Sequence, residues 1–401
     1  MRFINKLLGC AMSLLLACAG NGDWHGIRET RNGIEFVQNS EKGIWQNSRE
    51  LKLTSTLKIG ATDPTDPTCL KSVYDVDTDP AENIYICDYL AHKIQIFDHN
   101  GKWINQITHK ENPQNHLKSP SQIEIGPDGT IYVLERRETQ ISLFDATGKY
   151  LKSISLDDGR LFGFKVDSKN HLFISKLQLN VHEADSTNGK TAFMISELNH
   201  NGKLLNRFSK PYLIKEHKLL VNPFANSEIA ILSGHNILET LHHPYILRIY
   251  DRSRKLKKVI LKRTLNDVEP ALIGMPGLPF EVYLLLCRQM QCQTFELPDG
   301  KLLVDFIDRG PAFIKEFNEQ YQNQLFKHPL NLNESVGTNA QHCYDLFDKS
   351  GRFLQTFSID SFSGAVIKLV DSKGNMYLRT FDDANHCFQV HRCKYKFKKR
   401  S

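Results

Sequence analysis

Hydrophobic and polar residues alternate along this chain in short runs. Ile94 and Ile96 flank a polar residue, and Ile141 and Leu143 do the same 47 residues later. Alternation with a period of two is typical of a β-strand that has one buried face. Clusters of Asp, Asn and Gly separate the runs, and these residues favour tight turns. The pattern predicts an all-β protein of short antiparallel strands.

A longer segment is repeated in the first half of the chain. "IYICDYLAHKIQIFDHNGK" (84–102) is followed by "IYVLERRETQISLFDATGK" (131–149), which has the same length and aligns without a gap. Its last phrase, an aromatic residue before Asp-x-x-Gly-Lys, recurs in weaker form at 198–203, 250–255 and 347–352. A second phrase, a turn followed by an apolar strand, occurs at 79–85, 126–132, 167–173, 297–303 and 371–377. Two turn phrases per repeat indicate four strands per repeat.

Four-stranded repeats of about 40 residues are typical of β-propeller blades, which form a ring because one blade cannot bury both of its faces. Six repeats can be placed. Seven blades stay an alternative because the fourth repeat matches the turn phrase poorly. The predicted fold class is all-β: a six-bladed β-propeller of four-stranded antiparallel blades, with one partly helical loop insertion. The expected blade cores are 71–107, 118–155, 161–208, 225–262, 280–358 and 362–398.

The N-terminus has the features of an export signal. A short positive region precedes an apolar run that is too short to span a bilayer comfortably. The run ends in Leu15-Leu16-Ala17-Cys18, which resembles a bacterial lipobox, although an ordinary secretory signal with an incidental cysteine is an alternative. We therefore expect a signal peptide at 1–17, lipid on Cys18, a flexible tether at 18–32 and the propeller at 33–401.

The repeats also resemble a known family. "IEIGPDGTIYVLERRETQISLFDATGKYLKSI" (123–155) is similar to an NHL repeat. Together with the lipobox, it resembles the bacterial six-bladed β-propeller lipoproteins, whose function is largely uncharacterised. The resemblance is strong over 71–208 and weak over 225–345. It implies architecture and a bacterial cell-envelope location, at the outer membrane or periplasmic face, and it transfers no catalytic residue.

A propeller ring has to close, because an open blade edge would expose unpaired backbone groups. Residues 33–40, "GIEFVQNS", alternate as a strand does, and 387–397 near the C-terminus do the same. We expect this N-terminal material to complete the final blade.

The charge pattern bears on the choice of partners. The formal net charge of +6 depends on Arg2 and Lys6 in the expected signal peptide and on five positive residues within 394–400. Without these seven, 44 Lys and Arg residues face 45 Asp and Glu residues. A nucleic-acid-binding body would need a basic face, so nucleic acid is not an expected partner. The basic tail could contact anionic lipid head groups.

Blade geometry predicts which face of the propeller can bind. The short repeated turns share one face, whereas the second-to-third turns and the blade-to-blade connections share the other, which we term the loop face. Binding residues tend to lie on loops held by a rigid scaffold. The candidate binding residues on the loop face are Asp88, Tyr89, His92, Glu135, Arg136, Arg137, His242, His243, Asp308, Arg309, Arg379, Asp382 and Asp383.

The longest insertion, at about 309–341, holds Phe313, Phe317, Tyr321 and Leu325 at a spacing of four. This spacing predicts one apolar stripe of an amphipathic helix. The stripe is expected to pack on the propeller itself; the alternative is a lid or docking helix over the loop face.

Cysteines and acids give few clues to chemistry. Beyond Cys10 and Cys18, seven cysteines remain, and their spacing fixes no disulfide pairing. Cys387 and Cys393 on one strand would lie about 20 Å apart, too far to share an ion, although His391 and Cys393 could co-ligate with another strand. Paired acids such as Asp382 and Asp383 could bind a divalent cation such as calcium. No nucleophile, zinc or phosphate-loop motif occurs in the sequence.

These features favour a membrane-anchored extracytoplasmic binding or scaffold module that presents its loop face to a protein, peptide or glycan partner. No cofactor is predicted apart from the calcium alternative. The alternative function is a lactonase- or lyase-like hydrolase with a metal in the central channel, and an RNA-binding NHL domain ranks last.

Overall fold

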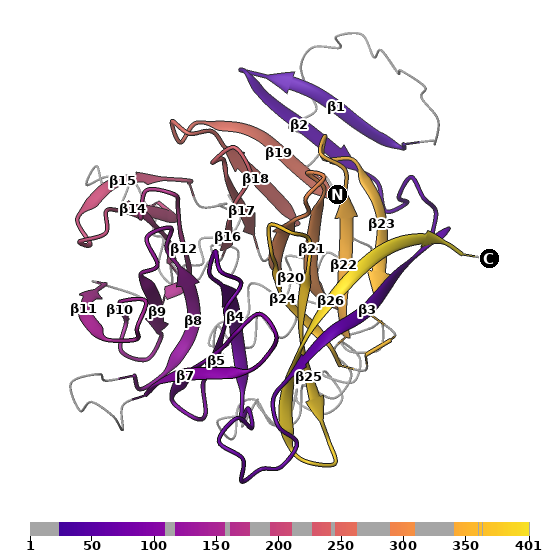
Figure 1. The fold of residues 1–401 in the computed structure, drawn as a ribbon. Helices are drawn as coiled ribbons and strands as arrows, with labels where there is room; N and C mark the ends of the chain where they lie inside the picture. Colours follow the sequence, from indigo (N-terminus) through magenta and orange to yellow (C-terminus); the bar gives the residue numbers. More distant parts are fainter. Residues whose placement is uncertain are drawn as a thin grey trace, which may run out of the picture.

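The computed structural model describes residues 24–108, 117–156, 161–176, 193–210, 227–241, 245–262, 289–308, 341–359, 361–362 and 364–400. They form six sheets arranged around one axis (Figure 1), all antiparallel apart from one parallel pairing in the fourth. The fold is a six-bladed β-propeller of four-stranded blades, as the repeats predict. No helix in these residues is long and apolar enough to cross a membrane.

The first three blades follow the chain in order, each from its innermost to its outermost strand. Blade 1 comprises β4 (Val73–Thr78), β5 (Ile84–Asp88), β6 (Lys93–Phe97) and β7 (Trp103–Thr108). Blade 2 comprises β8 (Pro120–Ile125), β9 (Ile131–Glu135), β10 (Gln140–Phe144) and β11 (Tyr150–Ser155). Blade 3 comprises β12 (Leu161–Val166), β13 (Leu172–Lys176), β14 (Ile195–Leu198) and β15 (Leu204–Phe208).

The last three blades recruit strands from elsewhere in the chain. Blade 4 comprises β16 (Ser227–Ile231), β17 (Ile237–Leu241), β18 (Ile246–Tyr250) and β19 (Leu256–Lys262), extended by β2 (Ile34–Asn39) and β1 (Gly26–Arg31). Blade 5 comprises β20 (Gln289–Glu296), β21 (Leu302–Asp308), β22 (Gln341–Phe347) and β23 (Phe353–Ser358). Blade 6 comprises β24 (Val366–Val370), β25 (Met376–Asp382), β26 (Cys387–Lys399) and β3 (Arg49–Ile59). The innermost strands pack against one another in sequence, and β24 returns to β4.

An N-terminal strand closes the ring, but it is not the one that the sequence suggested. β3 pairs antiparallel with β26 along the outer edge of blade 6, from Arg49–Lys399 to Ile59–Val390. The predicted strand at 33–40 lies elsewhere: β2 runs parallel to β19 on blade 4. β1 pairs with β2, so residues 26–31 are a strand rather than part of the flexible tether predicted for 18–32. The rest of that tether lies largely outside the described residues.

Asn39 explains the position of β2. Its side chain is buried between blades 4 and 5, where it donates to the carbonyls of Leu261 (3.2 Å) and Gly351 (3.0 Å). Its amide oxygen accepts from the backbone N–H of Phe353 (2.8 Å) and from the indole of Trp24 (2.9 Å). The four hydrogen bonds of the buried Asn39 amide fix β2 at this edge. If β2 paired elsewhere, the amide would lose these partners and be left buried and unpaired.

The repeated Asp-x-x-Gly phrase is a turn between the third and fourth strands of a blade. The Asp98 carboxylate accepts from the backbone N–H of Asn100 (2.9 Å) and Lys102 (2.8 Å), and these bonds hold the pKa of Asp98 below its usual value. Gly101 adopts a φ of 81°, which favours glycine. Blade 4 has Arg254 at this place, with a φ of 63°, and its guanidinium pairs with Glu197 of blade 3.

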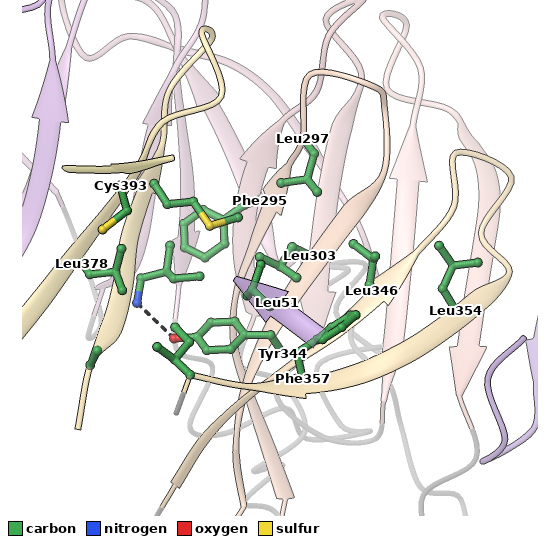
Figure 2. Packing of buried hydrophobic residues seen from close by; sticks show 14 residues of the cluster. Leu51, Phe295, Leu297, Leu303, Tyr344, Leu346, Leu354, Phe357, Leu378 and Cys393 are labelled. Atoms are coloured by element: carbon green, nitrogen blue, oxygen red, sulfur yellow. Dashed lines mark hydrogen bonds between the residues drawn. The ribbon is translucent and has the colours of Figure 1, made fainter. Parts of the chain in front are cut away.

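The hydrophobic core lies mainly between blades. Figure 2 shows the cluster between blades 5 and 6, where Leu51 of β3 and Leu378 of β25 lie with residues of blade 5. In this cluster the hydroxyl of Tyr344 accepts a hydrogen bond from the backbone N–H of Ile367 (3.0 Å). The apolar residues of each strand thus join neighbouring blades.

A disulfide adds a second closure of the ring. Cys69, in the segment that enters blade 1, is bonded to Cys387 at the start of β26, and their Cα atoms are 6.3 Å apart. The backbone N–H of Phe388 donates to the carbonyl of Leu70 beside it (2.8 Å). Cys87, Cys343 and Cys393 are free thiols, and Cys287 lies outside the described residues.

Candidate binding face

Two of the predicted binding residues are structural. Asp88 and Glu135 end the second strands of blades 1 and 2, and both are fully buried. The Asp88 carboxylate accepts from the backbone N–H of Lys71 and Ser72, each at 2.9 Å. Glu135 accepts from the backbone N–H of Lys118 (2.7 Å) and the amide of Gln140 (3.0 Å). Both carboxylates tie the incoming chain to their blade, so their prediction as ligand contacts is not supported.

An aromatic platform lies on the loop face of blades 1 and 2. Tyr74 stacks on Tyr89, with ring centroids 4.5 Å apart and planes 21° apart, and Tyr74 keeps 40% of its surface exposed. The Arg137 guanidinium lies 5.7 Å from the Tyr89 ring centroid. Leu90 beside them is 63% exposed. Two predicted residues, Tyr89 and Arg137, thus meet, and Tyr74 joins them. We term Tyr74, Tyr89, Leu90 and Arg137 the platform.

A β-bulge places Tyr74. The register of β4 on β5 shifts between Val73 and Asp75, so Tyr74 is the extra residue at the strand's beginning. β8 and β12 shift at the same position of their blades. Bulges re-aim side chains and are frequent at functional sites. The inner strands of these blades therefore begin with a built-in distortion at the loop face.

A second feature is a hollow of about 380 Å³ at the loop-face end of blade 6. Its lining residues come from the end of β25, from β26 and from the connection that precedes β24: Phe362, Thr380, Phe381, Asp382, Asp383, Gln389 and His391. Asp382 accepts from the backbone N–H of Ala384 (3.1 Å) and Asn385 (3.2 Å) and from the Asn385 side chain (3.0 Å), bonds that lower its pKa. Asp383 is exposed. The structure thus places both predicted acids in one site.

The other predicted residues are more scattered. His92 and Arg136 are exposed, and the His92 ring is bonded to the carbonyl of Lys118. Arg379 is partly buried on β25, donates to the carbonyl of Val73 (3.4 Å), and has a pKa lowered by burial. Asp308 ends β21 and is partly exposed. The remaining predicted residues, His242, His243, Arg309 and Cys18, lie outside the described residues, as does the apolar helical stripe predicted within the 309–341 insertion.

No group of three or more His, Cys, Asp or Glu side chains that could hold a metal occurs among the residues with described positions. The His391 ring is instead bonded to the Ser55 hydroxyl (3.3 Å), and burial lowers its pKa. The divalent-cation site suggested for Asp382 and Asp383 stays a prediction.

The sequence reading missed a set of charged residues on the innermost strands. They are Asp75, Asp77, Glu124, Lys165, Glu228 and Lys368. Asp75 and Asp77 accept from the backbone N–H of Ile123 (3.1 Å) and Ile125 (2.7 Å), so blade 1 satisfies the inner edge of blade 2. Lys165 pairs with Glu124, whose pKa burial nevertheless raises. The polar residues that alternate with apolar ones along the innermost strands were the sequence feature that could have indicated this set.

Glu228 should make the stability of the fold depend on pH. Burial raises its pKa to about 8, against the opposing charges of Arg136, Lys165 and Lys368, while Asp75 adds to the rise. Between its unfolded value of about 4.5 and 8, the folded chain binds more protons, so stability falls as pH rises and then levels off. We expect the protein to be about 2 kcal/mol less stable at pH 8 than at pH 5 because of Glu228. Partial solvent contact of this side chain keeps the effect to that size.

Urea unfolding at pH 5, 6.5 and 8 checks this expectation. Glu228→Gln should remove this pH dependence. Its stability relative to that of the native protein should therefore be higher at pH 8 than at pH 5. Glu41→Gln, at an exposed site, is the control and should track the native protein. An identical pH profile for Glu228→Gln and the native chain would contradict the assignment.

Comparisons with known proteins agree with this architecture. A family model described as a six-bladed β-propeller (DUF5128) matches residues 63–255, slightly under half of the chain. No curated protein matches the chain.

Solved structures show the same fold. A DUF4221 family member from Bacteroides vulgatus is 12% identical with a TM-score of 0.56, covering 88% of this chain and 100% of its own. A presumptive exported protein of Bacteroides fragilis is 10% identical with a TM-score of 0.57, covering 90% of this chain and 99% of its own. The virginiamycin B lyase of Staphylococcus aureus is 10% identical, covers 86% of this chain and 99% of its own, and reaches a TM-score of only 0.44. At these identities the likeness to the two Bacteroides proteins concerns the fold alone, and nothing is concluded from the lyase.

Proposed function

We propose that the protein is an extracytoplasmic binding module, anchored to the bacterial envelope through lipid on Cys18, that presents its loop face to a protein partner. The observation that carries the proposal is the platform. Stacked tyrosines beside an arginine have the composition of binding hot spots, in which Tyr, Trp and Arg are enriched. Of the partner classes left open by the sequence, this composition favours a protein.

The charge around the platform narrows the partner further. Arg136, Arg137 and His92 are exposed on the same face, whereas Asp88 and Glu135 are buried and hydrogen-bonded to the chain. Arg136 and Arg137 therefore place two exposed positive charges beside the neutral aromatic rings, against one partly exposed acid in the same loop, Glu138, which accepts a hydrogen bond from Ser119. Complementarity across an interface favours a partner with an acidic contact surface.

Three observations support an extracytoplasmic location. The disulfide between Cys69 and Cys387 is of the kind that persists in oxidising compartments. The N-terminal sequence has the order of an export signal. A protein of similar fold from Bacteroides fragilis is a presumptive exported protein.

The alternative enzyme has less support in the described residues. A channel-type hydrolase needs acids or amides that converge with free coordination positions. Asp75 and Asp77 accept backbone hydrogen bonds, Glu124 pairs with Lys165, and Asp382 stabilises its own turn. We therefore favour binding over catalysis.

Crosslinking in cells, followed by detergent solubilisation and affinity recovery of the full chain, tests the proposal. Tyr74→Ala and Arg137→Glu should each weaken the affinity for one stoichiometric partner by about thirtyfold or more and reduce its recovery accordingly, because hot-spot truncations cost about 2 kcal/mol or more. Lys102→Glu is the matched charge reversal, since Lys102 is exposed in the Asp-x-x-Gly turn on the opposite face. Equal recovery by all three variants would refute the platform as the contact site.

A further inference from the structure

Lys368 lies on β24, the innermost strand of blade 6, and its ammonium has no close partner. The register of β24 on β25 shifts between Ile367 and Leu369, so Lys368 is the extra residue of a β-bulge. Bulges re-aim side chains and are frequent at functional sites. Lys368 is only partly exposed, yet it makes no hydrogen bond or ion pair within the described part of the chain. Three N–H donors of a half-buried cation are therefore left for a ligand.

The Lys368 ammonium reaches toward the axis of the propeller. Its charge acts on Glu228 of blade 4, and so does the charge of Asp75 of blade 1. Blade 4 is next to neither blade 6 nor blade 1 in the ring. Side chains from these blades can come close only near the axis, where the innermost strands surround a common centre (Figure 1).

Arg379 adds a second cation beside Lys368. It lies on β25 opposite Val366, so Lys368 follows this pair by two residues. The Arg379 guanidinium reaches across to blade 1, where it donates one long hydrogen bond to the carbonyl of Val73 (3.4 Å). A guanidinium has five N–H donors, so this bond leaves most of them for a ligand. No acid forms an ion pair with either cation among the residues that the structure describes.

Nearby acids do not neutralise the two cations. Asp75 accepts from the backbone N–H of Ile123 (3.1 Å), and Asp305 is bonded to the ring of His342 (2.8 Å). Burial and the charge of Arg379 lower the pKa of Lys368, although both acids act in the opposite direction. Burial likewise lowers the pKa of Arg379. A bound anion would therefore stabilise both cations in their charged forms.

The two cations adjoin the platform. Val73, whose carbonyl accepts from Arg379, directly precedes Tyr74, and it begins β4 at the loop face. A partner that contacts Tyr74 can thus reach Arg379 and Lys368 without crossing another blade. A carboxylate suits this pair, because a guanidinium binds it through a planar fork and an ammonium through a point charge.

We propose that a carboxylate of the protein partner binds between the Lys368 ammonium and the Arg379 guanidinium while the rest of its contact surface packs on the platform. This inference rests on the proposed function and names the group that the partner presents. The carboxylate is either the end of the partner's chain or an acidic side chain, and both have the same chemistry.

Isothermal titration of the full chain in detergent with three acetylated tetrapeptides tests the site. Tetraglutamine with a free terminal carboxylate represents a chain end, tetraglutamate amide represents acidic side chains, and tetraglutamine amide has no carboxylate. Binding of only the first would identify a chain end, and binding of only the second would identify side chains. Binding of both would support the site with either source, whereas binding of neither, or equal binding of all three, would overturn it.

Two variants connect the binding to the two cations. Lys368→Met and Arg379→Gln should each weaken the better peptide by about tenfold or more, because each removes charge-assisted hydrogen bonds to the carboxylate. Lys58→Met is the control, since Lys58 is an exposed lysine on β3 at the outer edge of blade 6. It makes the same change of charge and should bind as the native chain does. Equal affinity of Lys368→Met and the native chain would refute the site.

A melting curve without peptide separates a ligand-binding lysine from a structural one. Lys368→Met should melt at or above the native temperature, because it removes a half-buried charge that has no ion pair. A clear fall in the melting temperature would show that the ammonium stabilises the fold, and it would overturn the inference.

Partner recovery in cells distinguishes failure of this inference from failure of the proposed function. If Tyr74→Ala loses the partner and Lys368→Met keeps it at the native level, the carboxylate site is wrong and the platform stands. If Tyr74→Ala keeps the partner while the peptides still bind through Lys368, the platform is wrong and the carboxylate site stands.

Discussion

Replacing both Leu51 and Ile59 of β3 by alanine is expected to cost about 4–8 kcal/mol of folding stability, a large part of the stability of a typical domain. Leu51 is 7% exposed and packs between blades 5 and 6, whereas Ile59 is 2% exposed and packs between blades 6 and 1. The two side chains thus attach the closing strand to the clusters on both sides of blade 6. Urea unfolding followed by circular dichroism measures the loss.

Two controls separate ring closure from the loss of any buried side chain. Thr54→Ala lies at an exposed position of the same strand and should cost less than about 0.5 kcal/mol. Val37→Ala removes a fully buried side chain from β2, which only extends blade 4, and should leave the unfolding transition cooperative. If the double variant of β3 costs no more than Val37→Ala, β3 is not the element that closes the ring.

The blades could be predicted because their signals are local. Alternation at Ile94 and Ile96 specifies a half-buried strand, and the carboxylate of Asp98 fixes the turn through bonds to residues two and four positions away. Such interactions are encoded within a few residues. The predicted blade cores accordingly match the six observed sheets closely.

The closing strand could not be predicted by the same reasoning. Residues 33–40 and 49–59 both alternate, so each can form an edge strand. The choice depends on distant partners: Asn39 needs acceptors and donors from blades 4 and 5, whereas Leu51 and Ile59 fit the clusters around blade 6. Periodicity carries no information about partners hundreds of residues away.

The candidate sites show a similar limit. Tyr89, Arg137 and Asp383 follow the second strands of their blades and Asp382 ends one, so the topology alone placed them on the loop face. Asp88 and Glu135 occupy the same kind of position but turn inward to accept backbone hydrogen bonds.

Isolated side chains are harder still to recognise. The unpaired amide of Gln389 depends on which groups surround it in space, and no local sequence feature distinguishes it from a hydrogen-bonded glutamine. Tertiary packing therefore decides whether a glutamine is hydrogen-bonded or left unpaired.

Removing the disulfide with Cys69→Ser and Cys387→Ser is expected to lower the free energy of unfolding by about 3–5 kcal/mol. The bonded cysteines are 318 residues apart in sequence, and a bridge across a long segment restricts the unfolded chain strongly. A reductant should lower the melting temperature of the native protein and leave that of the double variant unchanged. Cys343→Ser, which alters a partly exposed free thiol, is the control and should still respond to the reductant.

The disulfide and β3 join the same two blades, and combining their variants tests whether they act together. With β3 weakened, the bridge still holds the entry to blade 1 against β26, so blades 1 and 6 should stay in contact. Without the bridge, the β3 variant has no covalent link to keep these blades together. We therefore expect the combined variant to lose cooperative unfolding, whereas each parent retains a single transition. Strictly additive losses with one transition throughout would show that the two closures act independently.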